Sequence, residues 1–156
     1  ASDVYKRQTV HAALSQNVDE SVDFDEVART IVRMAGAIAS TDHAVEVITT
    51  GSFGTIQADQ AQALATVLNE LVANSVEHGL ADRDGLIEVR AEREGTSMTV
   101  TVADNGVGFV PGTPMSGLGT QIVHQMVRGE LKGSIEWAPR EGGGTLVTLH
   151  ANLDPA

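Results

Sequence analysis

Residues 59–79 constrain the fold most, because this segment is long enough for a major helix and carries two faces of different chemistry. Its apolar side chains recur at helical spacing, which predicts a buried stripe. The stripe consists of Leu64, Val67, Leu68, Leu71, Val72 and Ser75. Glu70, Asn74 and His78 are spaced four apart, so a helix places them in an arc of roughly 80° opposite the stripe. Gly79 is a natural C-cap for this helix.

The polar face of this predicted helix has two interpretations. A carboxylate such as Glu70 can orient water or accept a proton from an attacking nucleophile. The amide oxygen of Asn74 is a hard ligand that suits Mg²⁺, an ion that keeps several waters and bridges phosphates. The alternative is an ordinary solvated helix face, and the helix alone does not decide between the two.

The other elements are predicted from hydrophobic period and turn residues. Helices are predicted at 25–39, with Asp25 as the N-cap, and at 117–129. The first of these has an apolar stripe of Val27, Ile31, Met34, Ala35 and Ile38. Strands are predicted at 44–50, 86–94, 97–104, 131–137 and 145–151, and residues 22–24 form a short strand or a linker. Segregated strands with a few helices predict an α+β sandwich, with helices on one face of a mixed sheet.

Length, charge and cysteine content exclude several classes of protein. The chain has 156 residues, enough for one domain with a real core. A net charge of -11 disfavours a general nucleic-acid binder, although Mg²⁺ can bring positive charge to a triphosphate. The absence of cysteine excludes disulfides, thiolate nucleophiles and zinc–thiolate sites. With no apolar run of membrane-spanning length and no visible signal peptide, we expect a cytosolic protein without a membrane partner.

Asp104 ends a strand whose alternate residues Met98, Val100 and Val102 face inward, so its carboxylate is predicted at the end of a buried apolar face. A carboxylate there needs a partner. Being an acceptor only, it can take a hydrogen bond from the exocyclic amine of adenine. Guanine presents a carbonyl at the equivalent position, so this contact favours ATP. The alternative is an ordinary hairpin turn, which the Asp-Asn-Gly sequence also favours.

Two glycine motifs follow. Gly106 and Gly108 let the backbone approach a flat base, and Gly117 and Gly119 precede a helix whose free amides suit phosphate. Residues 110–116, between these motifs, are interpreted as a short mobile lid. Thr145 opens the last strand, either as a hydroxyl near the base or as a plain strand residue.

Together these segments resemble the GHKL ATPases (gyrase, Hsp90, histidine kinase, MutL). Residues 69–79 resemble the N box, residues 104–109 the first glycine box and residues 117–119 the second, and the resemblance runs from about 59 to 149. Residues 117–123 and 129–137 look most like cytosolic sensor histidine kinases of actinobacteria. Residues 11–16 resemble the end of a dimerisation hairpin, which divides the chain into a leader with a hairpin remnant (1–21) and a catalytic domain (22–156).

The resemblance implies a Bergerat α/β sandwich, ATP and Mg²⁺ as cofactors, and a role for each motif residue. Glu70 would be the base of the N box, Asn74 the Mg²⁺ ligand and His78 a contact near the nucleotide or lid. Asp104 would bind the adenine amine. The other nucleotide-binding residues implied are Gly106, Gly108, Gly117, Leu118, Gly119 and Thr145. The implied partners are a response regulator and the protein's own dimerisation domain, in a homodimer at full length.

Two positions depart from the pattern. Many histidine kinases have Asn at the position of Glu70, although Glu occurs in the subclass resembled here and in gyrase-like ATPases. Many also have a phosphate-binding Lys where this chain has Glu77. Phosphate charge would then be met by Mg²⁺, backbone amides or His78.

The chain lacks the His-Arg-x-x-Asn type of setting in which such kinases carry their phosphoacceptor. His11 matches a hairpin-end position rather than an acceptor, and His43, His124 and His150 are interpreted as surface residues. The sequence therefore favours the catalytic domain of a histidine kinase whose acceptor lies upstream, in a longer protein than this chain. Two alternatives stay open: an anti-sigma-factor serine kinase, which shares a Glu-x-x-x-Asn-x-x-x-His-Gly helix, and a nucleotide sensor that binds ATP without catalysis.

Overall fold

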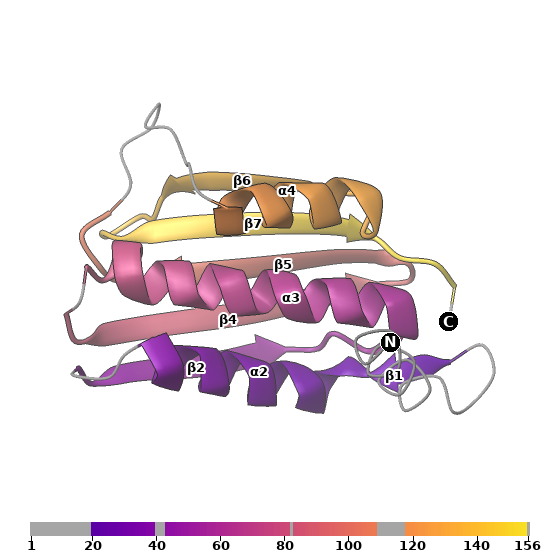
Figure 1. Ribbon diagram of the computed structural model, residues 1–156, viewed down its shortest axis with the longest axis horizontal. Helices are drawn as coiled ribbons and strands as arrows, with labels where there is room; N and C mark the ends of the chain where they lie inside the picture. Colours follow the sequence, from indigo (N-terminus) through magenta and orange to yellow (C-terminus); the bar gives the residue numbers. More distant parts are fainter. Residues whose placement is uncertain (1–19, 40–42, 82, 109–117, 156) are drawn as a thin grey trace, which may run out of the picture.

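The protein is described by a computed structural model covering residues 20–39, 43–81, 83–108 and 118–155. It forms two layers, with three helices packed on one face of a five-stranded sheet (Figure 1). The helices are α2 (Phe24–Ala39), α3 (Ala58–Asn74) and α4 (Leu118–Gly129), and α3 lies between the other two. The predicted α+β sandwich is therefore confirmed. None of the described helices is long and apolar enough to cross a membrane.

The main sheet has the strand order β2-β4-β5-β7-β6. Its strands are β2 (Val45–Gly51), β4 (Gly85–Glu94), β5 (Ser97–Asp104), β6 (Ser134–Pro139) and β7 (Thr145–Asn152). Only the β2–β4 pair is parallel, and the other three pairs are antiparallel, so the sheet is mixed, as predicted.

Strict alternation in the strands decides which residues meet the helices. Along β5, Met98, Val100 and Val102 are buried, and Asp104 continues the same parity at the strand's end. Along β7 the buried residues are Thr145, Val147, Leu149 and Ala151. Because β5 and β7 are antiparallel, the end of β5 lies beside the start of β7, with Ala103 paired to Leu146. A polar pair, Asp104 and Thr145, therefore closes one end of an otherwise apolar layer.

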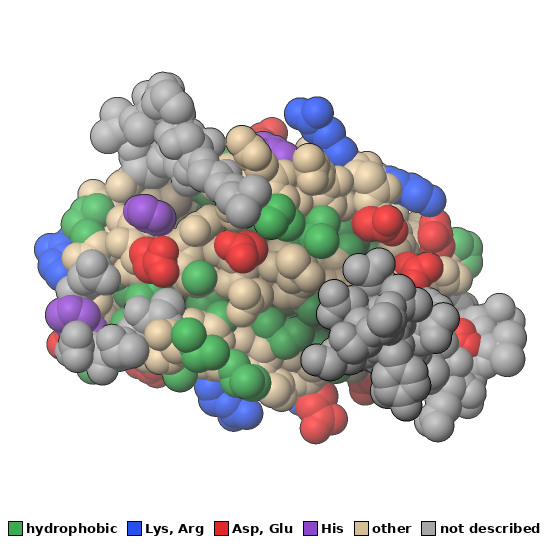
Figure 2. Space-filling model, viewed as in Figure 1, with side chains coloured by type: hydrophobic (Ala, Val, Ile, Leu, Met, Phe, Trp, Pro, Cys, Tyr) green, Lys and Arg blue, Asp and Glu red, His purple; other side chains and the backbone are tan. Residues whose placement is uncertain are grey.

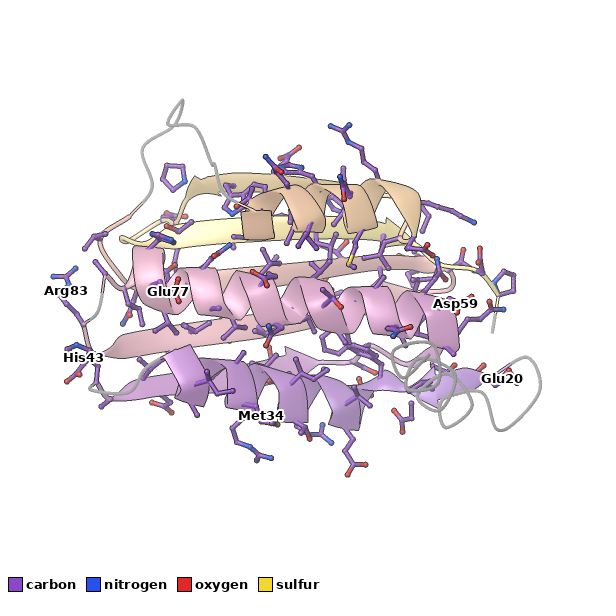
Figure 3. All side chains as sticks on the ribbon, viewed as in Figure 1. Glu20, Met34, His43, Asp59, Glu77 and Arg83 are labelled. Carbon is purple, nitrogen blue, oxygen red and sulfur yellow. The ribbon has the colours of Figure 1, made fainter. Side chains whose placement is uncertain are left out.

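The predicted stripe of α2 is wrong in part. Its core face consists of Phe24, Ala28, Val32 and Ala35. Met34 is 55% exposed and Ile38 is 73% exposed, and Figure 2 shows hydrophobic side chains at the surface over this helix. Figure 3 labels Met34 at the outer edge of α2. The helix approaches the sheet closely at Gly36, where an added Cβ would lie 2.8 Å from a methyl of Val47.

A second small sheet was not predicted. Strand β1 (Ser21–Asp23) pairs with β3 (Thr55–Gln57). Of the residues 22–24, predicted as a short strand or a linker, Val22 and Asp23 lie in this strand, whereas Phe24 begins α2. The predicted N-cap is also corrected. The carboxylate of Asp23 accepts the amide of Asp25 at 3.3 Å, whereas Asp25 accepts the amide of Phe53 and, at 3.1 Å, the hydroxyl of Ser52. Asp25 therefore ties α2 to the turn between β2 and β3. Residues 1–19, including the hairpin remnant, lie outside the described residues.

Candidate nucleotide-binding site

Asp104 is a buried carboxylate, 1% exposed, at the end of β5. Its Oδ1 accepts the amide of Gly106 at 3.0 Å and the amide of Thr145 at 3.2 Å. Its Oδ2 points toward Gly79, where an added Cβ would collide with it. Two backbone donors thus fix one oxygen, and the geometry directs the other toward the end of the long helix.

Burial raises the pKa of the Asp104 carboxyl above its ordinary value of 3.8. The amides of Gly106 and Thr145 and the positive charge of Arg140 each lower the pKa, but together they offset only part of the rise. The cause is desolvation, which disfavours the charged form of an acid. A hydrogen-bond donor brought by a ligand would therefore meet an anion that is short of solvation.

Three glycines allow the backbone segments around Asp104 to pack closely. A Cβ on Gly79 would meet the Asp104 carboxylate, one on Gly106 would meet the carbonyl of Gly79, and one on Gly144 would meet the carbonyl of Asp104. The amide of Val107 also donates to the carbonyl of Gly79 at 2.8 Å. Among the described residues the Asp-Asn-Gly sequence joins no pair of strands, and it packs against the end of the helix instead.

The long helix ends in a wider turn than predicted. After α3, residues Ser75–Gly79 form a π-helical turn, η1, and the amide of Leu80 donates to the carbonyl of Ser75 at 2.7 Å. Such turns often occur at functional sites. Asn74 is the last residue of the α-helix, half-buried, whereas His78 lies in the π turn and is exposed. Glu77 is also exposed, and Figure 3 labels it at the same end of the helix.

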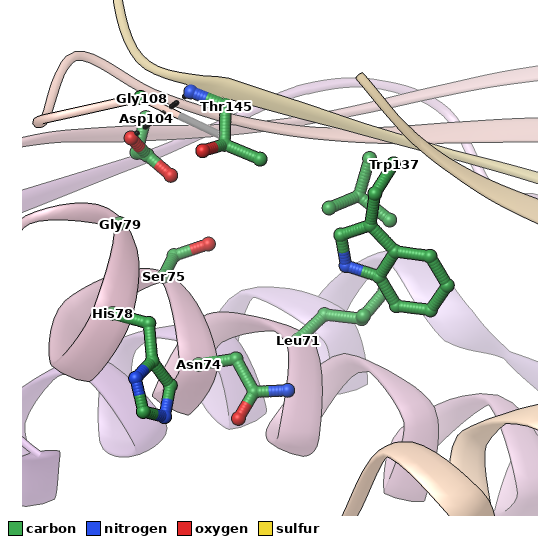
Figure 4. Close-up of a pocket in the computed structure, with 10 residues that line it drawn as sticks. Leu71, Asn74, Ser75, His78, Gly79, Asp104, Gly108, Trp137 and Thr145 are labelled. Carbon is green, nitrogen blue, oxygen red and sulfur yellow. Dashed lines mark hydrogen bonds between the residues drawn. The ribbon is translucent and has the colours of Figure 1, made fainter. Parts of the chain in front are cut away.

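These elements enclose a pocket between α3 and the sheet (Figure 4). It is lined by Leu71, Asn74, Ser75, His78, Gly79, Asp104, Gly108, Trp137, Thr145 and Val147. Its volume is about 80 Å³, below the roughly 300–1,000 Å³ of typical ligand sites. The described residues therefore hold only part of a nucleotide-sized ligand.

The pocket brings together Asn74, His78, Asp104, Gly108 and Thr145, all of which the sequence singled out. Gly108 has a φ of 94°, a conformation that favours glycine. Gly106 packs on the helix end and does not line the pocket. Gly117 and the predicted lid at 110–116 lie outside the described residues, and Leu118 is the first residue of α4.

Glu70 faces a different neighbour from Asn74 and His78. A Cβ on Gly119 would collide with its carboxylate, so Glu70 points to the first turn of α4. A carboxylate near a helix N-terminus is favoured by the helix dipole. The single predicted face is therefore divided: Asn74 and His78 line the pocket, whereas Glu70 lies where α3 meets the predicted phosphate helix.

Sequence reasoning missed two neighbours of the pocket. Trp137 lines it from β6, and the ring of His124 lies 5.3 Å from the indole, centroid to centroid. The interpretation of His124 as a solvent-facing residue is thus wrong, because it is half-buried against Trp137. The sequence did carry a sign of the inward position of Trp137, because Trp137 alternates with Ile135 along the edge strand β6.

The side-chain oxygens near the pocket could supply some, but not all, of the ligands of a nucleotide-bound Mg²⁺. Mg²⁺ in such sites takes one or two protein oxygens, several waters and substrate phosphates. Asn74 offers an amide oxygen in the pocket, and the Glu70 carboxylate is one helical turn earlier. Among the described residues no group of three or more acidic or histidine side chains could hold a metal alone. A metal here would need further oxygens, from water or from the phosphates of its ligand.

Comparison with known proteins decides the family. Residues 59–155 match the model described as "Histidine kinase-, DNA gyrase B-, and HSP90-like ATPase". The chain belongs to this ATPase family. The sensor histidine kinase PdtaS of Mycobacterium tuberculosis is 38% identical over 145 residues, which are 90% of this chain and 29% of that protein. The chain therefore spans less than a third of the length of this relative.

Two further similarities concern the fold and one segment. The histidine kinase domain of the blue-light activated kinase EL346 from Erythrobacter litoralis has a TM-score of 0.74 at 23% identity, covering 85% of this chain and 62% of that one. This likeness shows the Bergerat-type fold of histidine kinase ATP-binding domains. The anti-sigma F factor of Clostridium kluyveri is 32% identical over 51 residues, covering 33% of this chain and 36% of that protein.

Proposed function

We propose that this chain is the ATP- and Mg²⁺-binding catalytic domain of a sensor histidine kinase, which transfers the γ-phosphate to a histidine on an upstream dimerisation domain. The observation that carries the proposal is the shared pocket of Asp104 and Asn74. One residue comes from a strand end and the other from the long helix. If Asp104 and Asn74 lay on opposite sides of the molecule, they could not bind one nucleotide, and the proposal would be excluded.

In this proposal Asp104 recognises adenine. Its Oδ2 accepts the exocyclic amine of the base, while the amides of Gly106 and Thr145 hold Oδ1 in place. The buried threonine and the backbone at Gly108 complete the polar contacts at this end of the pocket. Guanine would bring a carbonyl to a buried carboxylate, a repulsive contact in a site short of water.

Asn74 holds the metal in this proposal, and His78 lies at the open edge of the pocket, toward the phosphates. Bound Mg²⁺ would neutralise part of the charge of the phosphates. The departure at Glu77 is compatible with this assignment, because Glu77 is exposed and does not line the pocket. The first turn of α4 offers backbone amides as a further source of positive potential.

Phosphoryl transfer depends mostly on positioning and on neutralising charge. Glu70 accepts the proton that the acceptor imidazole loses, and Gly119 keeps the backbone of α4 close to this carboxylate. The acceptor and the dimerisation hairpin come from outside the described residues, and a response regulator takes the phosphate onward. A cytosolic location stays a prediction of the sequence.

Calorimetric titration of the chain with Mg-ATP tests the proposal. We expect 1:1 binding, a loss of affinity of roughly hundredfold or more in Asp104→Asn, and loss of the Mg²⁺ dependence in Asn74→Ala. The first effect follows because Asn places a donor against the adenine amine in a buried site. Asn69→Ala on the same helix is the matched control for Asn74, because Asn69 is exposed. Wild-type affinity in both Asp104→Asn and Asn74→Ala would contradict the proposal.

The similarity to an anti-sigma F factor favours a second candidate, a serine kinase acting on a protein partner. The bond formed separates the two kinases. With the upstream hairpin supplied in trans, a histidine kinase yields a phosphoramidate that hydrolyses in acid, whereas phosphoserine survives. Acid-stable label on a serine would replace the first proposal by the second.

A further inference from the structure

Trp137 is the single tryptophan of the chain, and it lies on the helix-covered face of edge strand β6. The register pairs it with Val147 on β7, two residues beyond Thr145. Trp137 therefore lies on the strand next to Thr145, whose amide donates to Asp104. Two residues along a strand separate their positions by about 7 Å. The position of Trp137 follows from strand parity, so it is fixed by the fold and not by a loop.

The indole lines the pocket together with Leu71 and Asn74 of α3. Figure 4 shows Trp137 and Asp104 on opposite sides of the pocket, with the ring nitrogen of Trp137 turned toward the interior. The side chain is only half-buried. A large aromatic surface therefore stays accessible in a pocket whose other wall carries the hydrogen-bonding carboxylate.

His124 holds this indole from the side of α4. The two rings are 5.3 Å apart at an angle of 49°, within the range of tilted aromatic pairs. His124 also borders a separate hollow between α4 and β6, with Arg128 and Ile135. The imidazole therefore borders that hollow and also packs against the indole, a position from which it can restrict rotation of Trp137.

We infer that Trp137 is a nucleotide-contacting residue whose indole packs against the purine and ribose, with His124 as the positioning residue behind it. The inference rests on the proposed function and names a contact that the motif residues do not include. The hydrogen bonds of Asp104 select the base, and the indole supplies a flat aromatic surface, which the aliphatic side chains Leu71 and Val147 do not offer. Stacking of a base on an aromatic side chain is worth roughly five- to hundredfold in affinity.

Tryptophan emission tests the contact directly, because no other tryptophan contributes to it. We expect adenosine and ADP, added without metal, to change the emission of the wild-type chain and to reduce its quenching by acrylamide. Inorganic diphosphate should change neither, because the contact is to the nucleoside. Unchanged emission and quenching at saturating ADP, with binding measured in parallel by calorimetry, would overturn the inference.

Variants measure what the contact contributes. Trp137→Val should lower ADP affinity by roughly tenfold, and Trp137→Phe should lower it less, because phenylalanine keeps an aromatic surface. Ile135→Val, on the same strand and face, is the matched control and should bind normally. His124→Ala should weaken binding by a smaller factor, and His124→Phe should restore it. Wild-type ADP affinity in both Trp137 variants would overturn the inference, even if the wild-type emission responds to ADP.

The two proposals fail in different ways. If the wild-type chain binds no adenine nucleotide by calorimetry, the proposed function fails. If it binds ADP with the Asp104 dependence described above and Trp137 neither responds nor contributes, only the present inference fails. Circular dichroism of Trp137→Phe, with its smaller change in volume, separates loss of contact from loss of fold.

Discussion

The two ends of the pocket are built differently. At the base end, Asp104 is buried, one of its oxygens accepts two backbone amides, and glycines at 79, 106 and 144 bring three segments into contact around it. At the phosphate end, Asn74 is half-buried, His78 is exposed, and Glu70 lies against the start of α4. Among the described residues there is no group of three or more acidic or histidine side chains that could hold a metal.

This difference indicates a division of labour. In the proposed function the base end is organised by the fold alone, so the groups proposed to recognise adenine are in place without a ligand. In the same proposal the phosphate end would be completed by groups that the ligand brings, its metal above all. Substitutions at the base end should therefore affect all adenine ligands, whereas those at the phosphate end should affect only ligands with phosphates or only the transfer step.

The largest effect is expected from Gly79→Ala. The added methyl would collide with the Asp104 carboxylate, so binding of adenosine, ADP and ATP should be lost together. Overpacking costs about 1–3 kcal/mol, which corresponds to a melting temperature lower by roughly 3–10 °C. Gly129→Ala is the control, because an added Cβ there meets nothing within 4 Å. Normal adenosine binding by Gly79→Ala in calorimetry would show that the base end is not rigid.

Glu70→Gln should separate transfer from binding. Gln keeps the shape of the side chain against Gly119 but is a poor proton acceptor, so phosphotransfer to a hairpin supplied in trans should fall roughly hundredfold or more. ADP affinity should stay within about threefold of wild type, since Glu70 does not line the pocket. An equal loss in affinity and in transfer rate would assign Glu70 to binding instead.

The pH dependence should run in opposite directions for binding and folding. Because the folded pKa of Asp104 is raised above 3.8, acidification protonates the carboxylate and weakens adenosine binding before pH 3.8 is reached. For folding, the native state binds this proton more tightly than the unfolded state. The contribution of Asp104 to stability therefore rises as the pH falls through the folded pKa and is least favourable at neutral pH.

Comparing wild type with Asp104→Asn isolates this group from the other carboxylates. Denaturant titrations between pH 4 and pH 7 should show the wild type gaining stability relative to the variant as the pH falls. Adenosine affinity of the wild type should fall over the same range. A difference in stability that does not change with pH would place the Asp104 pKa at its ordinary value.

The smallest effect is expected from His78→Ala. The side chain is exposed at the pocket edge, so Mg-ATP affinity should fall about two- to fivefold, as for a screened interaction. Adenosine affinity should not change, because the base end does not involve this residue. Calorimetric titration of His78→Ala with Mg-ATP and with adenosine measures the two affinities. An equal loss of affinity for both ligands would contradict the division between the two ends of the pocket.

Hydrophobic periodicity predicted the strands in which one face of the sheet packs against the helix layer. The strands at 86–94 and 97–104 and the inward position of Asp104 follow from alternation, and the structure has them there. Periodicity did not predict which side of α2 meets the sheet. The helix has a regular apolar stripe that tertiary packing leaves partly exposed, formed by Val27, Ile31, Met34 and Ile38. Small residues approach the sheet more closely, and packing decides the rotation of the helix.

The candidate site was predicted as a set of residues but not as a geometry. Spacing alone put Glu70, Asn74 and His78 on one face, yet a π turn follows Asn74, and no local signal in the sequence marks it. The glycine motifs were predicted to approach a ligand, whereas Gly106 approaches the backbone of the helix end. The contact of His124 with Trp137 joins a helix to an edge strand, and such pairings depend on topology that one sequence does not display.

The meeting of Gly79, Gly106 and Gly144 around one carboxylate has a consequence for genetics. Where main chains touch one another, no rotamer can adjust, so every substitution there is resisted regardless of its chemistry. A saturation scan that selects for signalling would rank these three positions with the residues that handle phosphate. The scan would then find the least tolerant positions at glycines that take no part in a reaction. These glycines only determine how closely three segments of the chain can approach one another.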